Sequence, residues 1–202
     1  MGVKERRQRE KKFLREEILD AARELFIKHG YDNVTMRKIG QKIEYSPTTI
    51  YLYFQDKCEI LHTLCEETFG KLLKVFNGIE RSPLTPVEKL TEMGKAYIRF
   101  GLQHPNEYRM VFMTAPAEIK DHEHVQDSAG MKTFECLLKC VQGCIDSGEF
   151  RPLNVPAAGQ ALWGAVHGVT SLLINSCGFP FVETELLIDT VLDATINGLR
   201  SK

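Results

Sequence analysis

The sequence predicts an all-α fold. No segment shows the sustained alternation of apolar and polar residues that marks a half-buried strand, whereas apolar residues recur every three or four positions along most of the chain. Hydroxyl or carboxylate side chains also stand where the helices would begin, as N-caps do. Hydrophobic residues make up 43% and charged residues 26% of the 202 residues, a composition that supports a sizeable core and excludes global disorder.

The first helix is predicted over residues 14–28. Its apolar residues recur at a spacing of three or four: Leu14, Ile18, Ala21, Ala22, Leu25 and Phe26. Gly30 stands just beyond the end, where a left-handed residue commonly terminates a helix. This helix therefore has one apolar face to bury.

Two short helices follow. Thr35 can cap a helix over 36–42. Ser46 can cap another over 47–54, because Pro47 then takes the first helical position, where its missing N–H is harmless. Two helices joined by so short a connection are typical of a helix-turn-helix.

The remaining helices are longer. Asp56 can cap the fourth, with Glu59 three residues later in a capping-box pattern. A proline-containing break follows, after which Thr85 can cap the next helix in the same way. Pro86 then takes the first turn, and Glu88 completes the capping-box pattern. We expect the further helices over 86–103, 105–114, 121–147, 155–176 and 183–200.

We expect two domains, a small helical unit over residues 1–57 and a larger helical body over 58–202, linked by the fourth helix. The net charge of the chain is −1, yet residues 1–15 hold seven basic and two acidic residues. This basic arm before the first helix indicates that one end of the molecule faces a polyanion. On DNA, the arm could lie along the backbone or enter a minor groove.

The sequence lacks the marks of a membrane or secreted protein. No run of about 18 apolar residues is present, and the charged N-terminus has no apolar core of a secretory signal. The six cysteines are too few for a disulfide scaffold and form no CxxC pair. We therefore expect a cytoplasmic protein with reduced thiols and no membrane partner.

The residue types around the third helix suit contacts with DNA. Thr48 and Thr49 are small enough to approach base edges in the major groove, including thymine methyls. The hydroxyls of Tyr51 and Tyr53 can reach phosphates. The basic candidates for phosphate contacts are Arg37, Lys38 and Lys57. The opposite side of the helix carries apolar residues that should pack inward, Ile50 and Phe54.

Residues 18–61 resemble the DNA-binding domain of the TetR family of transcriptional repressors. The resemblance is carried by Ile18-Leu19-Asp20-Ala21-Ala22, Leu25-Phe26, Gly30-Tyr31, Val34-Thr35-Met36-Arg37-Lys38-Ile39, Ser46-Pro47-Thr48-Thr49-Ile50-Tyr51-Leu52-Tyr53-Phe54 and Lys57. It implies that the third helix enters the major groove. The candidate DNA-binding residues are then Thr35, Arg37, Tyr45, Ser46, Pro47, Thr48, Thr49, Tyr51, Tyr53 and Lys57.

The connection between the second and third helices departs from the family pattern. Glu44 stands where the family usually has glycine, and Tyr45 where it usually has a small apolar residue. We expect Glu44 to take a left-handed conformation at roughly 1 kcal/mol more than glycine, and its carboxylate to repel phosphates. Tyr45 either adds a DNA contact or fills the space under the turn.

The body has bulky residues at helical spacing, which is typical of a core, and the resemblance implies an effector pocket there as well. Residues 104–112 and 163–168 resemble a C-terminal subfamily named for its Trp-His-Gly signature. The candidate effector-binding residues are Tyr97, Phe100, His104, Tyr108, Phe112, Trp163 and His167. We expect a small apolar or amphipathic effector and no cofactor. On so apolar a helix, His167 could also be a core histidine.

Glycines interrupt the helix predicted over 155–176. Gly159, Gly164 and Gly168 each cost about 1 kcal/mol there, which indicates the close approach of another helix or room for a ligand. A repressor that reads two half-sites of a palindromic operator needs a two-fold dimer. The resemblance implies a homodimer through the last two helices. The final helix offers an apolar face of Leu186, Leu187, Val191, Leu192, Ile196 and Leu199.

Two clusters suggest other chemistry. Cys136, Cys140 and Cys144 share a helical face. A thiol sensor needs exposed cysteines of low pKa, whereas buried cysteines simply fill a core.

The run His122-Glu123-His124 lacks the i, i+4 pairing of a zinc helix, so we expect no metal site. The chain shows no nucleophile elbow, phosphate loop or defined carboxylate pair, so we expect no enzyme.

These observations predict a bacterial homodimeric repressor, on the nucleoid when bound to a palindromic operator, that an effector releases. Two other interpretations stay open. One is a constitutive or thiol-responsive regulator without an organic ligand. The other is a helical small-molecule-binding protein whose DNA-binding head is vestigial. Operator-specific, salt-dependent DNA affinity separates the repressor from this last class.

Overall fold

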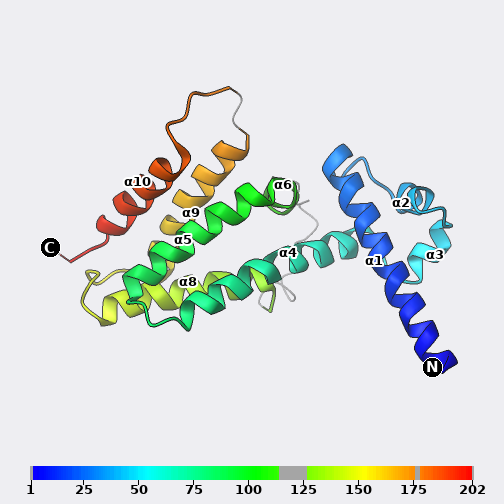
Figure 1. Ribbon diagram of the computed structural model, residues 1–202, viewed down its shortest axis with the longest axis horizontal. Helices are drawn as coiled ribbons and strands as arrows, with labels where there is room; N and C mark the ends of the chain where they lie inside the picture. The colour runs from blue at the N-terminus through cyan, green and yellow to red at the C-terminus, as the bar shows by residue number, and fades with distance from the viewer. Residues whose placement is uncertain (1, 114–126, 176–177, 202) are drawn as a thin grey trace. The chain divides into compact units, whose positions relative to one another are not determined.

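A computed structural model describes residues 2–113, 127–175 and 178–201. Within these ranges the chain forms helices and one isolated antiparallel bridge, between Phe150 and Arg200. The all-α prediction is thus confirmed. The helices are α1 (Val3–His29), α2 (Met36–Lys42), α3 (Pro47–Tyr51), α4 (Lys57–Glu80), α5 (Pro86–Gln103), α6 (Pro105–Met113), α8 (Ala129–Asp146), α9 (Val155–Ile174) and α10 (Thr184–Asn197) (Figure 1).

The chain divides into two compact units. The first comprises Met1–Thr68 with Asn106–Asp121, and the second comprises Phe69–Pro105 with His122–Lys202. The domain boundary predicted at residue 57 coincides with the start of α4. The division between the compact units falls farther along this helix, which therefore contributes residues to both.

The first unit has its core between α1, α2, α3 and the beginning of α4, with α1 packed on α2 and α2 on α3. Its buried apolar side chains are Ile18, Leu19, Ala22, Phe26, Ile39, Ile50, Phe54, Ile60, Leu61 and Leu64. An ion pair of 2.7 Å between Lys42 and Glu24 joins α2 to α1, and one of 3.0 Å between Arg23 and Glu67 joins α1 to α4. Apolar burial supplies most of the stability, because such surface pairs contribute little.

The predicted caps are present. Thr35 and Ser46 each accept a backbone N–H of the helix they begin, at 3.2 Å. At α5 the Thr85 hydroxyl accepts the N–H of Glu88 at 3.4 Å, and the Glu88 carboxylate accepts the N–H of Thr85 at 2.8 Å. That backbone hydrogen bond holds the pKa of Glu88 below its usual value. These bonds fix the helix starts because they satisfy N–H groups that have no partner within the helix.

The first helix is longer than predicted, since α1 begins at Val3 rather than at residue 14. The predicted basic arm is therefore the N-terminal part of a helix. Its residues are mostly Arg, Lys, Glu and Gln, which are strong helix formers. The Glu5 carboxylate accepts the N–H of Gly2 at 3.0 Å, and Arg6 pairs with Glu10 at 2.8 Å one turn on. The prediction missed these turns because it followed apolar periodicity, which they lack.

Other boundaries differ less. α3 ends at Tyr51 rather than at residue 54, and the N–H of Leu52 bonds to the C=O of Thr49 at 3.2 Å, which tightens the last turn. α10 ends at Asn197, and the chain beyond it turns to pair Arg200 with Phe150. The early part of the helix predicted over 121–147 lies outside the described residues.

The second unit is built around α5, which packs against α8, α9 and α10. Its buried residues include Leu72, Phe76, Leu90, Met93, Ile98, Val141, Leu162, Val166 and Ile188. α10 comes so close to α5 that a Cβ at Gly94 would collide with the Leu192 side chain. No helix in the described ranges is long and apolar enough to cross a membrane.

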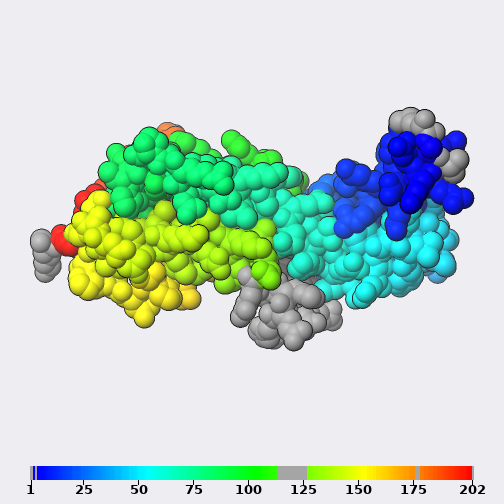
Figure 2. All heavy atoms as spheres, turned by 90° about the horizontal axis from the view of Figure 1, so that it is seen from below, coloured from blue at the N-terminus to red at the C-terminus, as the bar shows by residue number. Residues whose placement is uncertain are grey.

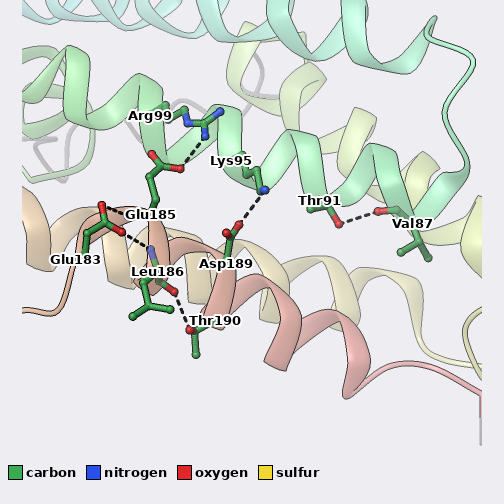
Figure 3. A network of polar contacts seen from close by, with 9 residues as sticks. All are labelled: Val87, Thr91, Lys95, Arg99, Glu183, Glu185, Leu186, Asp189 and Thr190. Carbon is green, nitrogen blue, oxygen red and sulfur yellow. Dashed lines mark hydrogen bonds and ion pairs between the residues drawn. The ribbon is translucent and has the colours of Figure 1, made fainter.

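Charged side chains tie α10 to α5 along their length (Figure 3). Lys95 pairs with Asp189 at 2.8 Å, and Arg99 pairs with Glu185 at 2.7 Å. This packing corrects one expectation from the sequence. Leu192 and Ile196, assigned to an outward apolar face of the final helix, are buried within the chain. They cannot contribute to a dimer face because α5 and α9 already use that side of α10.

Candidate nucleic-acid interface and ligand-binding residues

The turn between α2 and α3 is tight. The N–H of Tyr45 donates to the C=O of Gly40 at 2.9 Å, and a Cβ at Gly40 would lie only 2.7 Å from the Tyr45 carbonyl oxygen. Glu44 has a φ of 62°, which confirms the left-handed conformation predicted for it. The two helices meet closely because Gly40 has no side chain and Glu44 adopts a conformation that favours glycine.

The outer face of α2 and α3 is open to solvent. The exposed candidate DNA-binding residues are Thr35, Arg37, Tyr45, Ser46, Thr48 and Tyr51, and the half-buried ones are Pro47, Thr49, Tyr53 and Lys57. Tyr45 is 43% and Tyr51 55% exposed, which is high for such large side chains. The exposure of Tyr45 favours a contact at the surface over a filling role under the turn. A surface of hydroxyls and tyrosines suits hydrogen bonds to phosphates and base edges.

The inner face of α3 holds the helix in place. Ile50 and Phe54 are fully buried, as predicted. The guanidinium of Arg15 on α1 lies 4.9 Å from the centre of the Phe54 ring, a cation–π contact. The hydroxyls of Ser46 and Thr49 are 3.0 Å apart, so each helps to orient the other.

The lysines near this face also make contacts within the chain. The Lys57 ammonium donates to the Tyr31 carbonyl oxygen at 3.1 Å and lies 4.0 Å from the centre of the Tyr31 ring. The Lys38 ammonium donates to the Asn33 carbonyl oxygen at 2.7 Å. An ammonium has three donors, so these bonds fix the position of each charge without using all of its hydrogen-bonding capacity.

Leu52 is one surface residue that the sequence prediction left out. Its side chain is 74% exposed, beside Tyr51 and directly after α3. The signal for it was its spacing, because it follows Thr48 by four residues and so shares the outer face of the helix. An apolar side chain there suits a thymine methyl.

Three of the candidate effector-binding residues meet in the second unit. The Tyr97 hydroxyl lies 3.2 Å from the indole nitrogen of Trp163 and 3.2 Å from Nδ1 of His167. Indole N–H only donates, so the Tyr97 oxygen accepts from Trp163. Either the Tyr97 hydroxyl or Nδ1 of His167 can be the donor in the other hydrogen bond. Burial lowers the pKa of His167, which favours the neutral ring.

The other candidates form two pairs of tilted rings. The rings of Phe100 and His104, near the end of α5, have centroids 4.9 Å apart. Tyr108 and Phe112, one turn apart on α6, have ring centroids 4.7 Å apart. The first pair belongs to the same compact unit as Tyr97, whereas the second belongs to the first unit. A role in effector binding stays a prediction for all four.

The glycines of α9 have different surroundings. A Cβ at Gly159 would lie 2.5 Å from the Leu138 side chain, so this glycine permits the close approach of α8. A Cβ at Gly164 or Gly168 would meet no atom within 4 Å. Of the two explanations offered by the sequence, close helix contact therefore accounts for Gly159, and open space lies beside the other two.

The three regularly spaced cysteines are buried free thiols of α8, and burial is the leading cause of their raised pKa values. The pKa rises to about 11 for Cys140 and to about 12 for Cys144. A redox-sensing cysteine needs the opposite, an accessible thiol with a lowered pKa. Cys140 instead packs its sulfur 3.8 Å from that of Met93. Their surroundings support a role in the core.

Metal binding finds no support in the described part of the chain, where no three His, Cys, Asp or Glu side chains are grouped as metal ligands would be. The run His122-Glu123-His124 lies outside the described residues.

Two family models match the chain. The one described as bacterial regulatory proteins, tetR family, matches residues 18–64. The one described as tetracyclin repressor-like, C-terminal domain, matches residues 90–197, which is more than half of the chain. The two matches correspond to the helix-turn-helix and to the helical body. Neither bears on the Trp-His-Gly resemblance, which stays a prediction.

Individual relatives agree with these matches. The fatty acid metabolism regulator protein of Bacillus subtilis (strain 168) is 26% identical over 192 residues, which cover 92% of this chain and 95% of that protein. The HTH-type transcriptional repressor Rv1474c of Mycobacterium tuberculosis is 36% identical over 61 residues, which cover 30% and 33%. The solved structure of the regulator FadR from Bacillus subtilis in complex with stearoyl-CoA shares the fold, with a TM-score of 0.76 at 23% identity over 92% and 99% of the two chains.

Proposed function

Because the chain belongs to the TetR family of bacterial regulatory proteins, we propose that it represses transcription as a homodimer on a palindromic operator and that a long-chain acyl-CoA releases it. The observation that carries the proposal is the exposed, hydroxyl-rich face of α2 and α3 above a fully buried inner face. We retain residues 1–57 as the DNA-binding domain and 58–202 as the effector-binding and dimerisation domain. Its action rests on binding rather than catalysis and takes place on the bacterial nucleoid, in the cytoplasm.

We assign the DNA contacts by exposure and chemistry. Thr48, at the start of α3, has a small exposed side chain suited to a base edge. The exposed hydroxyl of Tyr51 and the guanidinium of Arg37 suit phosphates, and Arg37 can also reach a guanine. The remaining candidates either border this face or orient its side chains: Thr35, Tyr45, Ser46, Pro47, Thr49, Tyr53 and Lys57.

A homodimer through α9 and α10 is supported by the outer face of α9. Small or apolar residues recur there every three or four positions, all of them at least partly exposed in the single chain: Ala157, Ala161, Gly164, Gly168 and Leu172. This face carries no charge, so its burial removes apolar surface from water without burying an unpaired charge. Beside it α10 exposes Leu186, at 57%. The open space at Gly164 and Gly168 is then room for a helix of the partner.

The acyl-CoA class follows from two observations. One is the likeness to a fatty acid metabolism regulator along nearly the whole chain and to a regulator solved in complex with stearoyl-CoA. The other is the group of Tyr97, Trp163 and His167, in which burial favours a neutral imidazole. Neutral polar groups among aromatic rings suit a thioester carbonyl better than a free carboxylate, whose charge they cannot balance. The Phe134 ring, with its centroid 6.2 Å from that of Trp163, is an apolar neighbour that suits an acyl chain.

Release of DNA requires the effector to bind the two states of the repressor with different affinity. A ligand that bound the operator-bound and free states equally would shift nothing. Couplings of this kind typically change affinity by about 5- to 150-fold. We therefore expect stearoyl-CoA to weaken operator binding by at least about tenfold.

The experiment begins with selection of an operator from sheared host DNA at physiological salt. Affinity for the selected duplex is then measured with stearoyl-CoA, with coenzyme A alone and with stearate. Only the thioester should release the DNA. Full release by stearate would overturn the acyl-CoA assignment, and recovery of no palindromic sequence would favour a vestigial DNA-binding head.

Two variants separate the two halves of the proposal. Tyr51→Phe should weaken operator binding and leave the response to stearoyl-CoA and the dimer intact, because it removes one surface hydroxyl. Tyr97→Phe should keep operator affinity and weaken the response to stearoyl-CoA, because Trp163 and His167 lose their shared partner. An unchanged response in Tyr97→Phe would remove this group from the effector site.

A further inference from the structure

The N-terminal turns of α1 carry a stripe of positive charge in line with the buried face of the same helix. Successive members are three or four residues apart, and Ile18 and Ala22 continue the same series into the core: Lys4, Arg7, Lys11 and Arg15. Residues three or four apart share one face of a helix. From Ile18 onward this face is buried, whereas residues 4–13 are all exposed. We call the four basic residues the basic stripe.

The two acidic residues of this segment are engaged elsewhere. The Glu5 carboxylate accepts the N–H of Gly2, and the Glu10 carboxylate pairs with Arg6. Neither belongs to the basic stripe. Glu5 is not three or four residues from any of its members, and Glu10 has that spacing only to Arg7. The stripe is thus a one-sign surface about 17 Å long at about 1.5 Å per residue.

The C-terminal end of the basic stripe lies beside α3. Its last member, Arg15, lies over the ring of Phe54, which follows α3 by three residues. From there α1 runs on past α3 (Figure 1), and its dark blue N-terminal turns lie at the surface of the first unit (Figure 2). The match to the family's DNA-binding model begins at residue 18, so the exposed turns lie outside it.

We propose that the basic stripe is a second DNA contact, which binds phosphates of the duplex beside the groove that α3 enters. This inference rests on the proposed function. Its ligand is the sugar–phosphate backbone, because the stripe offers Lys and Arg charges without a pattern of side chains that could read bases. Each strand carries one phosphate per about 3.4 Å of helix axis, so a stripe of this length can contact more than one of them. It strengthens binding to any duplex and leaves sequence preference to α3.

The test measures affinity against salt concentration for the full-length protein, with an operator duplex and with a random-sequence duplex of equal length. The variant is Arg7→Gln with Lys11→Gln, which keeps helix propensity nearly unchanged. Each lost phosphate contact lowers the slope of log affinity against log salt by about 0.9. We expect the slope to fall by about 1.8 on both duplexes. Between 50 and 200 mM salt, the variant should then lose about 12-fold less affinity than the parent protein.

The matched control is Arg6→Gln with Arg9→Gln, which removes the same charge from the other side of the same turns. Its slope should equal that of the parent protein. Equal loss of slope in both double variants would overturn the proposal, since it would reflect net charge alone. An unchanged slope in the Arg7 and Lys11 variant would overturn it as well. Circular dichroism confirms that both variants keep their helix content.

The design separates this inference from the proposed function. If the chain did not recognise an operator, the parent protein would bind the two duplexes equally, and the random duplex would still report on the basic stripe. If only the stripe proposal failed, operator preference would be intact and the slopes would not change. Loss of operator preference in the Arg7 and Lys11 variant would show a role in base recognition and contradict a phosphate-only contact.

Discussion

At the scale of single residues, Glu44 affects both the stability of the fold and the charge near α3. Its φ of 62° is costly for a residue with a side chain, and its exposed carboxylate lies in the turn that leads into α3. We predict that Glu44→Gly raises the free energy of unfolding by about 1 kcal/mol. It should also tighten binding to the operator about 2- to 5-fold at low salt, as the loss of one repelling surface charge would. Urea unfolding and DNA titration measure the two effects.

A second variant at the same position separates strain from charge. Glu44→Ala removes the carboxylate and keeps a Cβ in the left-handed region, so it should tighten DNA binding without the gain in stability. Equal stability of the glycine and alanine variants would show that the turn does not strain the chain. Unchanged DNA affinity in both would show that this carboxylate lies too far from phosphates to matter.

The sequence predicted the surroundings of the DNA-binding candidates better than those of the effector-binding candidates, whose roles all stay predictions. The candidates around α3 are contiguous in sequence, and a single short helix presents Thr48 and Tyr51 outward while it buries Ile50. The effector candidates depend on which helices become neighbours. Sequence spacing placed Trp163 and His167 on one face of α9, but the hydrogen bonds of both to Tyr97 come from the packing of α5 on α9.

At the scale of elements, caps and prolines predicted where helices begin, and apolar periodicity predicted which faces are buried. Both signals are local. The periodicity stops at Leu14, so the charged turns of α1 had no signal except propensity. Periodicity also cannot say which neighbour covers an apolar face, and α10 illustrates this. Leu192 was assigned to a dimer face, whereas the structure buries it beside Gly94 of α5.

The joint between α2 and α3 depends on the closeness of two backbone segments. A Cβ at Gly40 would lie 2.7 Å from the carbonyl oxygen of Tyr45, and a backbone atom cannot move aside as a flexible side chain can. We predict that Gly40→Ala destabilises the protein by about 1–3 kcal/mol, as overpacking does. It should also weaken operator binding, because α3 would be displaced. Urea unfolding and DNA titration test both.

The matched control is Gly78→Ala in α4, where an added Cβ meets no atom within 4 Å. Alanine is the better helix former, so this variant should be as stable as the parent protein or more stable by up to about 1 kcal/mol. Stability of Gly40→Ala equal to that of the control would mean that the turn can relax. The close contact would then not determine the geometry of the joint.

At the scale of the whole molecule, the proposed function requires more than one chain. Each chain has a single α3, so reading a palindrome takes two copies related by a two-fold axis. Apolar side chains that remain exposed on the last two helices include Leu172 at 59% and Leu186 at 57%. On the same face of α9 as Leu172, Gly164 and Gly168 leave room for a second helix to approach. The dimer proposal thus rests on what the single chain leaves uncovered.

This interface gives the last prediction. Gly164→Leu adds a side chain in open space, so the monomer should fold as before, but the leucine would hold the partner helix away. We expect a shift from dimer to monomer in sedimentation at micromolar concentration and loss of operator affinity by about tenfold or more, because each head would then bind one half-site alone. The control Gly78→Leu makes the same change on α4, also in open space, and should remain dimeric. If Gly164→Leu stayed dimeric with full operator affinity, the subunits would have to associate through a surface other than the small-residue face of α9.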